Sequence, residues 1–294
     1  MDWLTGIQNA INYVEDNLAE EINYADVAKR AGCSSFYFQK LFTILCGITL
    51  GEYIRCRRMT LAGAELSKAD CKVIDVAFKY GYESPESFTR AFSKFHGITP
   101  TEAKRDGSKL KYFFPLTVKI ALEGGDLMNY KIVEKPAFDI IEKLEVQSNE
   151  NNESLRTIQE FWKRNEEDGT LEMLFEGTCD KSSILGICYA NFARFKYFDY
   201  SIAARWDENA PLPEGFRRSR IPKRTWAVFE CVGPIPEAME KEWQRVVSEF
   251  FPTSCYEPTY EMDLEIYPRG DRKSADYRSE IWVPVKKRED KNEN

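Results

Sequence analysis

The chain has 294 residues, of which 43% are hydrophobic and 30% are charged. This composition is ordinary for a globular protein, and the chain is long enough to form two domains with separate hydrophobic cores. No apolar run approaches the about 20 residues that a membrane-spanning helix needs, and the amino terminus lacks the basic and hydrophobic order of a signal peptide. The pattern excludes the membrane-spanning and secreted classes, and we expect a cytoplasmic protein without membrane contact.

The eight cysteines are scattered, with no Cys-x-x-Cys pair, and His96 is the single histidine. This pattern fits neither a disulfide framework nor a metal motif, so we expect reduced, mostly buried thiols, no metal ion and no cofactor. A thiol redox sensor is the alternative, although isolated cysteines more often act as small hydrophobic residues. His96 precedes Gly97, where we expect it to complete a helix C-cap.

The formal net charge of −7 is unlike that of most nucleic-acid-binding proteins, so the distribution of charge matters more than its sum. Up to Ser108 the chain carries 13 basic and 14 acidic residues, and after it 28 basic and 34 acidic ones. The first part is therefore close to neutral and can present a basic face, while the acidity belongs to the remainder.

The first part contains an internal repeat. Residues 26–55 match residues 75–105 at an offset of 49, which becomes 50 after one inserted residue. Twelve positions are identical, several times the number expected by chance, which indicates a duplication. The identical residues of the first copy are Asp26, Val27, Ala28, Gly32, Ser35, Phe38, Phe42, Gly47, Ile48, Thr49, Glu52 and Arg55.

Each copy follows the pattern of a helix-turn-helix. Helices are expected over 22–30 and 73–79, and each ends just before a glycine, Gly32 or Gly81, that supplies the left-handed backbone of the turn. Ser34 or Ser35 caps the second helix of the first copy, and Ser84 caps that of the second, with Pro85 in its first turn. The positions expected to be buried are Phe38, Leu41, Phe42, Leu45, Phe88, Ala91, Phe92 and Phe95.

A lone helix-turn-helix also occurs in proteins that never contact DNA, so one copy alone would leave the function open. The duplication favours DNA binding, because residues 50–66 are expected to form one helix of about 25 Å that separates the copies. Adjacent turns of a major groove lie about 34 Å apart. One chain could place both second helices in successive grooves, and we therefore prefer a monomer to a homodimer.

Residues Ile11 to Arg105 resemble the DNA-binding domain of AraC/XylS-type transcription regulators of the Rob-like kind. The segment IDVAFKYGYESPESFTRAFSKFHGITPTEAKR, which begins at Ile74, carries the most specific part of the match. The resemblance implies an all-α domain over residues 1–108 that binds promoter or operator DNA in the nucleoid, with RNA polymerase as a further partner.

The resemblance also assigns contacts with DNA. Arg90 is the expected bidentate partner of a guanine, whereas Pro85 and Glu86 depart from family members with glutamines there and leave base reading by that helix open. At least one of Arg55, Arg57 and Arg58 is expected to clamp phosphate rather than to face solvent. The expected DNA-binding residues are Phe36, Gln39, Lys40, Arg55, Ser87, Thr89, Arg90 and Lys94.

After Ser108 the sequence pattern changes to short runs of β-branched and aromatic residues that are separated by turn residues. This pattern predicts an α+β domain over residues 109–294. A β-β-α-β-β order occurs twice, which suggests two pseudo-symmetric halves and an antiparallel sheet. The expected strands are Leu116 to Ala121, Tyr130 to Val133, Phe138 to Leu144, Ile184 to Tyr189, Tyr197 to Arg205, Thr225 to Cys231, Tyr260 to Tyr267 and Glu280 to Val285. The expected helices are Leu155 to Asn165 and Pro236 to Phe250.

The last two expected strands alternate between apolar and polar positions. Glu265 and Tyr267 share one face of the first strand, and Glu280 and Trp282 share one face of the second. Acids beside aromatic rings in a cleft would suit a flat, apolar, positively charged ligand. A half-solvated sheet whose acids face water explains the spacing equally well, so the spacing leaves both interpretations open.

Residues Tyr130 to Lys286 resemble the GyrI-like effector-binding domain, in segments that include KIVEKPAFDII, WAVFECVGPIPEAM, DLEIYPRGD and SEIWVPV. The resemblance implies a groove between two halves that binds amphipathic, often cationic, small molecules, as in multidrug responses, with a strand glutamate at its floor. By position that glutamate is Glu280. The expected ligand-binding residues are Glu280, Trp282, Tyr267, Glu265, Trp226 and Tyr189.

Together these patterns predict a sequence-specific transcription regulator that senses a small molecule. The acidic second domain could weaken DNA binding in the free state. A hydrolase with a glutamate as general base is an alternative. However, no Ser-His-Asp set is expected around His96, the single histidine, and the sequence contains no P-loop, so we expect that the protein is not an enzyme. A sequestering protein of the GyrI-like type is a further alternative, and it would leave the repeat unused.

Overall fold

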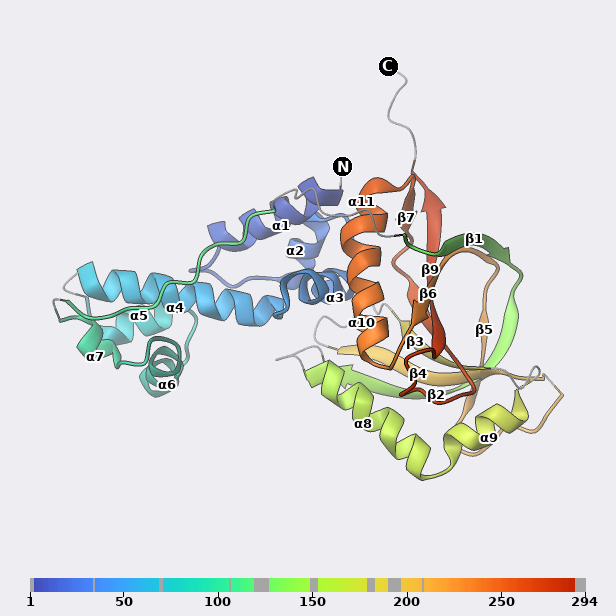
Figure 1. The fold of residues 1–294 in the computed structure, drawn as a ribbon. Coiled ribbons are helices and arrows are strands. Elements are labelled where there is room, and N and C mark those ends of the chain that lie inside the picture. Colours follow the sequence, from blue (N-terminus) through green and yellow to red (C-terminus); the bar gives the residue numbers. More distant parts are fainter. Residues whose placement is uncertain are drawn as a thin grey trace, which may run out of the picture. The chain divides into compact units, whose positions relative to one another are not determined.

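The structure, a computed structural model, describes residues 3–33, 35–68, 71–105, 107–118, 127–148, 153–178, 183–189, 197–207 and 209–288 (Figure 1). The chain forms two compact units, one of residues 1–35 and 48–121 and the other of residues 36–47 and 122–294. Among the described residues, no helix is both long enough and apolar enough to cross a membrane. The domain limits 1–108 and 109–294 remain a prediction.

The first unit is helical, as expected. Its helices are α1 (Trp3–Asp16), α2 (Tyr24–Arg30), α4 (Leu50–Lys68), α5 (Val73–Lys79), α6 (Pro85–His96) and α7 (Pro100–Ala103). The sequence predicted α5 with its observed limits and α4 to within two residues. Ser84 caps α6 by accepting a hydrogen bond from the backbone N–H of Ser87, and Gly81 holds a φ of 79° in the turn before it. The second copy of the repeat is therefore a helix-turn-helix.

The core of this second copy lies between α4, α5, α6 and α7. Phe88 and Phe92, two of the positions predicted to be buried, are fully enclosed there with Met59 and Leu66 of α4. Because these aromatic residues recur every four positions, they bury one face of α6 and leave the opposite face to solvent. The long helix α4 thus serves as the support against which the second copy is built.

The strand expected from Leu116 to Ala121 is wrong for residues 116–118, and residues 119–121 lie outside the described ones. Residues 109–118 instead run extended along the first unit (Figure 1). Side chains, not a neighbouring strand, accept their backbone N–H groups: Lys111 donates to His96, Phe113 to Thr60, Leu116 to Tyr53 and Val118 to Gln8. Since helix side chains satisfy these donors, no sheet ladder is required.

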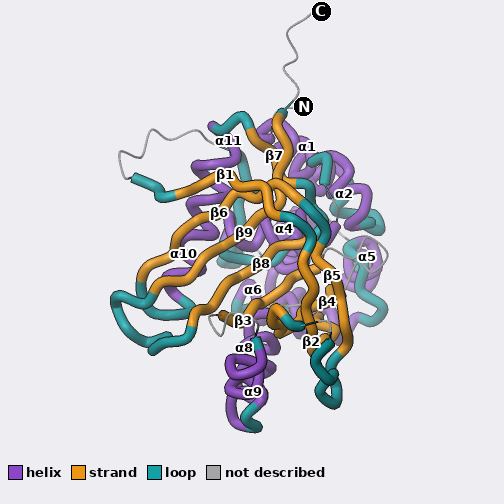
Figure 2. The backbone as a smooth tube through the Cα atoms, turned by 90° about the vertical axis from the view of Figure 1, so that its right-hand side faces the viewer, coloured by secondary structure: helices purple, strands orange, loops and turns teal. Residues whose placement is uncertain are grey.

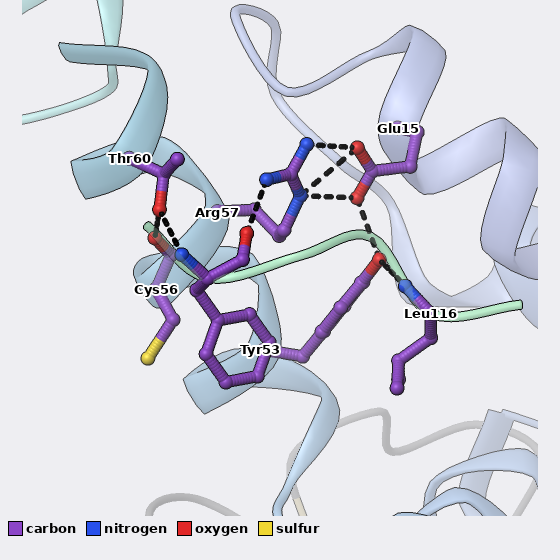
Figure 3. A network of polar contacts seen from close by, with 7 residues as sticks. Glu15, Tyr53, Cys56, Arg57, Thr60 and Leu116 are labelled. Atoms are coloured by element: carbon purple, nitrogen blue, oxygen red, sulfur yellow. Dashed lines mark hydrogen bonds and ion pairs between the residues drawn. The ribbon is translucent and has the colours of Figure 1, made fainter. Parts of the chain in front are cut away.

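A charged network anchors this extended segment and α1 to α4 (Figure 3). The Arg57 guanidinium donates to both carboxylate oxygens of Glu15, at 2.8–3.0 Å, and to the carbonyl oxygen of Phe113. Tyr53 donates to the same carboxylate at 2.6 Å and accepts from the backbone of Leu116. Arg57 is 4% exposed, so it is a structural residue and cannot reach a phosphate.

The neighbouring arginines differ from Arg57 and from each other. Arg58 donates to the carbonyl oxygens of Leu18 and Glu20, so its guanidinium also holds the unit together. Arg55 lies at the surface beside Glu52, at 3.0 Å, with 44% of its side chain exposed. Of the three arginines considered as phosphate clamps, Arg55 is the one left available.

His96 does not complete a helix cap, because Gly97 does so with a φ of 83°. The imidazole is 4% exposed, its Nδ1 accepts from the backbone of Lys111, and its Nε2 lies 2.9 Å from the carbonyl oxygen of Met59. Burial lowers the pKa of His96, and the Met59 carbonyl offsets this only in part. Gly63 leaves room for the ring, since a Cβ there would lie 2.8 Å from it. His96 is thus a neutral bridge inside the first unit.

The second unit contains α3 (Ser35–Cys46) and a curled antiparallel sheet with helices. Its strands are β1 (Tyr130–Lys135), β2 (Phe138–Ser148), β3 (Ser183–Tyr189), β4 (Tyr197–Arg205), β5 (Arg217–Ile221), β6 (Arg224–Val232), β7 (Tyr256–Pro258), β8 (Met262–Pro268) and β9 (Arg278–Lys287). Its other helices are α8 (Glu153–Glu167), α9 (Thr170–Gly177), α10 (Glu237–Arg245), the π-helix η1 (Val246–Phe250) and α11 (Phe251–Thr253). The strands β5 and β7 and the helix α9 were not predicted.

The strand order β1-β6-β9-β8-β3-β4-β2-β5 confirms two pseudo-symmetric halves (Figure 2). The strands β3 and β8 meet at the centre, β4 and β9 flank them, and β2 and β6 follow. Each half lends its first strand to the other, because β1 pairs with β6 and β5 pairs with β2. The central pair places equivalent positions of the two halves side by side.

The two faces of this sheet have different cores. One face packs Ile184, Tyr200 and Ile202 against Phe161 of α8 and Leu174 of α9. The same face carries Cys231, whose sulfur lies 3.7 Å from that of Met239 of α10. The opposite face gathers Leu185, Leu264 and Trp226. We call the first the helix-covered face and the second the inner face.

Candidate DNA-reading helices and effector site

The solvent-facing side of α6 carries a charged stripe. Glu86, Arg90 and Lys94 are four residues apart and exposed, while Phe88 and Phe92 anchor the helix from behind. Thr89 is partly exposed, and the Ser87 hydroxyl donates to the carbonyl oxygen of Ser84 in the helix cap. The basic end of the stripe therefore has the exposure that contact with DNA requires.

The helix α3, the second helix of the first copy, is different. Two of its expected DNA-binding residues are withdrawn from solvent: Gln39 is 6% exposed, and the Lys40 side chain is 17% exposed. Contact with DNA would require both side chains to face solvent, which they do not do here. The side chain of Phe36 lies outside the described ones. As α3 lies in this structure, a base edge cannot reach Gln39 or Lys40.

Lys40 is enclosed by an acid and an aromatic ring of the sheet domain. Its ammonium nitrogen lies 2.8 Å from Oδ2 of Asp263 on β8 and 3.8 Å from the centre of the Trp243 ring on α10. Burial alone would lower the pKa of Lys40, but the charges of Asp263 and Glu265 outweigh it and the pKa is raised. Lys40 therefore remains a cation in this position.

Glu265, on the same face of β8, is held by aromatic donors. Trp243 donates to Oε1 at 2.9 Å, and Tyr267 donates to Oε2 at 2.8 Å. Trp162 of α8 packs its ring 4.9 Å from that of Tyr267 and donates to the Tyr200 hydroxyl at 2.8 Å. We call Glu265, Trp162, Trp243, Tyr200 and Tyr267 the Glu265 site.

The centre of the sheet makes room for this arrangement. Gly186 of β3 lies opposite Glu265, and a Cβ there would come within 2.4 Å of the Tyr200 hydroxyl and 3.4 Å of Glu265 Oε2. Burial, followed by the negative charge of Glu265, raises the pKa of both Tyr200 and Tyr267 well above the usual value. Both phenols therefore remain protonated and able to donate to an anion.

The six predicted ligand residues lie on two faces of the sheet. Glu265 and Tyr267 lie on the helix-covered face. The register pairs Glu265 with Ile281 and Leu264 with Trp282, which places Glu280 and Trp282 on the inner face, with Trp226 and Tyr189. The predicted ligand residues thus form two separate groups on opposite faces of the sheet and do not line a single cleft.

Of the inner-face group, Glu280 and Trp282 line a pocket of about 430 Å³ together with Lys135 and Arg205. Glu280 accepts from Trp282 at 2.7 Å and pairs with Lys131 at 3.0 Å. Trp226 is fully buried, and Tyr189 donates to Glu142 at 2.6 Å. Lys131 already pairs with Glu280, and Lys135 and Arg205 line the same pocket, so basic side chains surround the carboxylate that a ligand cation would need there.

Sequence reasoning missed Asp263, Trp162, Trp243 and Tyr200. The two tryptophans lie in the helices expected from Leu155 to Asn165 and from Pro236 to Phe250, and Asp263 lies in the strand expected from Tyr260 to Tyr267, two residues before Glu265. A tryptophan at the centre of each helix of a duplicated fold was a usable signal, because symmetry brings the two equivalent helices to the same face.

The described cysteines are free, as expected, but most are half-buried and Cys255 is exposed, which corrects the expectation of mostly buried thiols. Cys179 lies outside the described residues. Burial raises the pKa of Cys33 to about 12 and that of Cys46 to about 11. These thiols are protonated at neutral pH, the unreactive form for a redox sensor. Within the described ranges no group of three or more His, Cys, Asp and Glu side chains could hold a metal ion.

Two family models match the chain. Residues 131–285 match the integron-associated effector binding protein, and residues 27–106 match a helix-turn-helix domain. The chain belongs to the integron-associated effector-binding protein family. In this member, the effector-binding domain follows an AraC-type DNA-binding domain, as the sequence predicted.

Curated relatives match the DNA-binding part of this family member. The HTH-type transcriptional activator AarP of Providencia stuartii is 36% identical over 32% of this chain and 70% of its own length. The regulatory protein SoxS of Salmonella typhimurium is 36% identical over 33% of this chain and 90% of its own length. The effector-binding part is similar to SAV2435, whose structure was determined with tetraphenylphosphonium bound. The two are 24% identical in sequence, the match covers 54% of this chain and 94% of that chain, and the TM-score is 0.48.

These matches confirm the predicted class of function. This member of the effector-binding family is a DNA-binding transcription regulator with a small-molecule-sensing domain.

Proposed function

We propose that this regulator reads a specific DNA sequence and that its effector is an amphipathic organic cation bound at the Glu265 site. The observation that carries the proposal is Lys40, a cation held 3.8 Å over the Trp243 ring and 2.8 Å from Asp263. A position that holds an ammonium in this way also suits a ligand cation, because both use the negative face of a ring and a desolvated carboxylate.

The surroundings of the Glu265 site support binding rather than turnover. Each carboxylate oxygen of Glu265 accepts a hydrogen bond from an aromatic donor, so the anion is held in a fixed position. Four rings provide apolar area around it. A general base needs an oxygen free to take a proton from water, and here both are engaged. Effector binding without hydrolysis is therefore part of the proposal.

Three further points belong to the same proposal. The DNA-binding domain spans residues 1–108, and the effector domain spans residues 109–294. The duplicated repeat lets one chain bind DNA as a monomer, since it carries two reading helices. The regulator also contacts RNA polymerase in this proposal, because its relative AarP is named a transcriptional activator.

Replacing Glu265 by glutamine should weaken binding of tetraphenylphosphonium, used as the probe, by about 10- to 150-fold, because a charged partner contributes roughly 1.5–3 kcal/mol. The matched control is Glu280→Gln, which makes the same change on the inner face and should leave the affinity within about twofold. Titration of the full chain by calorimetry measures both. Loss of binding in Glu280→Gln with Glu265→Gln unaffected would place the ligand in the inner-face pocket and contradict the proposal.

A further inference from the structure

We infer that Lys40 is a tethered competitor of the effector: the ammonium of the DNA-reading helix α3 occupies the cation position beside the Glu265 site, and the effector must displace it. The inference rests on the proposed function, because it names the regulation of that same site. It links two properties of Lys40 that the sequence and the structure provide separately, a predicted contact with DNA and an observed contact with the acidic face of β8.

The contacts of Lys40 are those of a bound ligand. Its ammonium is paired with Asp263, whose side chain is 4% exposed, and stacks on Trp243, which also donates to Glu265. A second contact lies on the same helix, where the Tyr37 ring meets that of Tyr260 edge-on at 4.4 Å. A lipophilic cation placed over Trp243 would overlap the Lys40 ammonium, since two cations cannot share one ring face at 3.8 Å.

The docked helix is unable to read DNA. Lys40 and Gln39 are withdrawn from solvent, and the acids that surround Lys40 would repel the phosphates of an approaching duplex. A ligand that binds only when the Lys40 ammonium has left Asp263 and Trp243 therefore favours the state in which α3 is released from the sheet. Thermodynamic reciprocity then requires that the probe strengthen DNA binding by the same factor by which DNA strengthens probe binding.

Removal of the competing ammonium is the direct test. In the full chain, Lys40→Met keeps the length of the side chain without its charge and should bind tetraphenylphosphonium about tenfold more tightly than the wild type, within the usual range of coupling between sites. The matched control is Lys109→Met at an exposed lysine of the first unit, which makes the same charge change and should leave the affinity unchanged. Quenching of tryptophan fluorescence gives a second readout, because Trp162 and Trp243 line the site.

The outcomes separate this inference from the proposed function. If Lys40→Met binds the probe no more tightly than the wild type while Glu265→Gln still binds weakly, the site stands and the competition is wrong. If Glu265→Gln binds as well as the wild type, the proposed site itself is wrong.

A second variant acts on the other side of the contact. Asp263→Asn removes the partner of Lys40 and should raise the affinity for a selected duplex in the absence of probe, and added probe should then give little further increase. A wild type whose DNA affinity does not respond to saturating probe would overturn the inference, whatever the behaviour of the variants.

Discussion

Replacing Arg90 by alanine should weaken binding of the regulator to its preferred duplex by about 1–3 kcal/mol, or roughly 5- to 150-fold. Arg90 is exposed on α6 between Phe88 and Phe92, which are fully buried and fix the direction of the helix. A guanidinium presented in this way can form two parallel hydrogen bonds with one guanine. The loss should be accompanied by relaxed specificity at a single base pair, as measured by titration of a set of single-substitution duplexes.

Lys109→Ala is the control for this prediction, because Lys109 is also an exposed cation of the first unit but lies outside α6. It should change affinity by less than Arg90→Ala does and should leave specificity intact. Equal losses in both variants, uniform over all duplexes and with a reduced dependence on salt, would mean that Arg90 contacts phosphate and not a base.

Replacing Arg57 by methionine should lower the free energy of unfolding of the first unit by about 3–5 kcal/mol, since removing one partner leaves a carboxylate in a largely enclosed position. Glu15 would lose its bidentate partner and the Phe113 carbonyl its donor, so α1 and the extended segment would both be released from α4 (Figure 3). Hydrogen exchange of the full chain measures this region separately, with the strands of the second unit as internal reference.

Arg55→Met is the matched variant for stability. The Arg55 side chain is 44% exposed and pairs with Glu52 at the surface, so its removal should cost less than about 1 kcal/mol. Similar exchange rates in the two variants would show that the buried network does not hold the first unit together.

Local signals made the helices of the second copy of the repeat predictable. The aromatic spacing, the Ser84 cap and the turn glycine Gly81 act over a few residues, and each is confirmed where it was expected. The strand expected from Leu116 to Ala121 is wrong over residues 116–118 for the opposite reason. Its β-branched residues indicate a strand, but its backbone N–H groups donate to side chains up to 110 residues away in the chain.

The effector site could be predicted only in part, because the face on which a strand residue lies depends on register. Alternation along β8 and β9 was correctly predicted for each strand alone. Whether Glu265 and Glu280 share a face depends on the offset between the strands, and the observed pairing of Glu265 with Ile281 separates them. Nothing local in the sequence encodes that offset.

The contact of Lys40 with Asp263 is the feature of the site that the sequence predicted least. The two residues lie 223 positions apart, and each belongs to a segment that resembles a different family. Sequence patterns identified Lys40 as a candidate for DNA and the acids of β8 as candidates for a cation. Only the structure shows that these two predictions concern one position.

Selection of duplexes from a random pool by the full chain, at near-physiological salt and with and without tetraphenylphosphonium, tests the central claim most directly. We predict enrichment of two short elements about one helical turn apart, with stronger enrichment of the element read by α3 when the probe is present. No enrichment of any sequence under either condition would contradict the assignment of this chain as a sequence-specific regulator controlled by an organic cation.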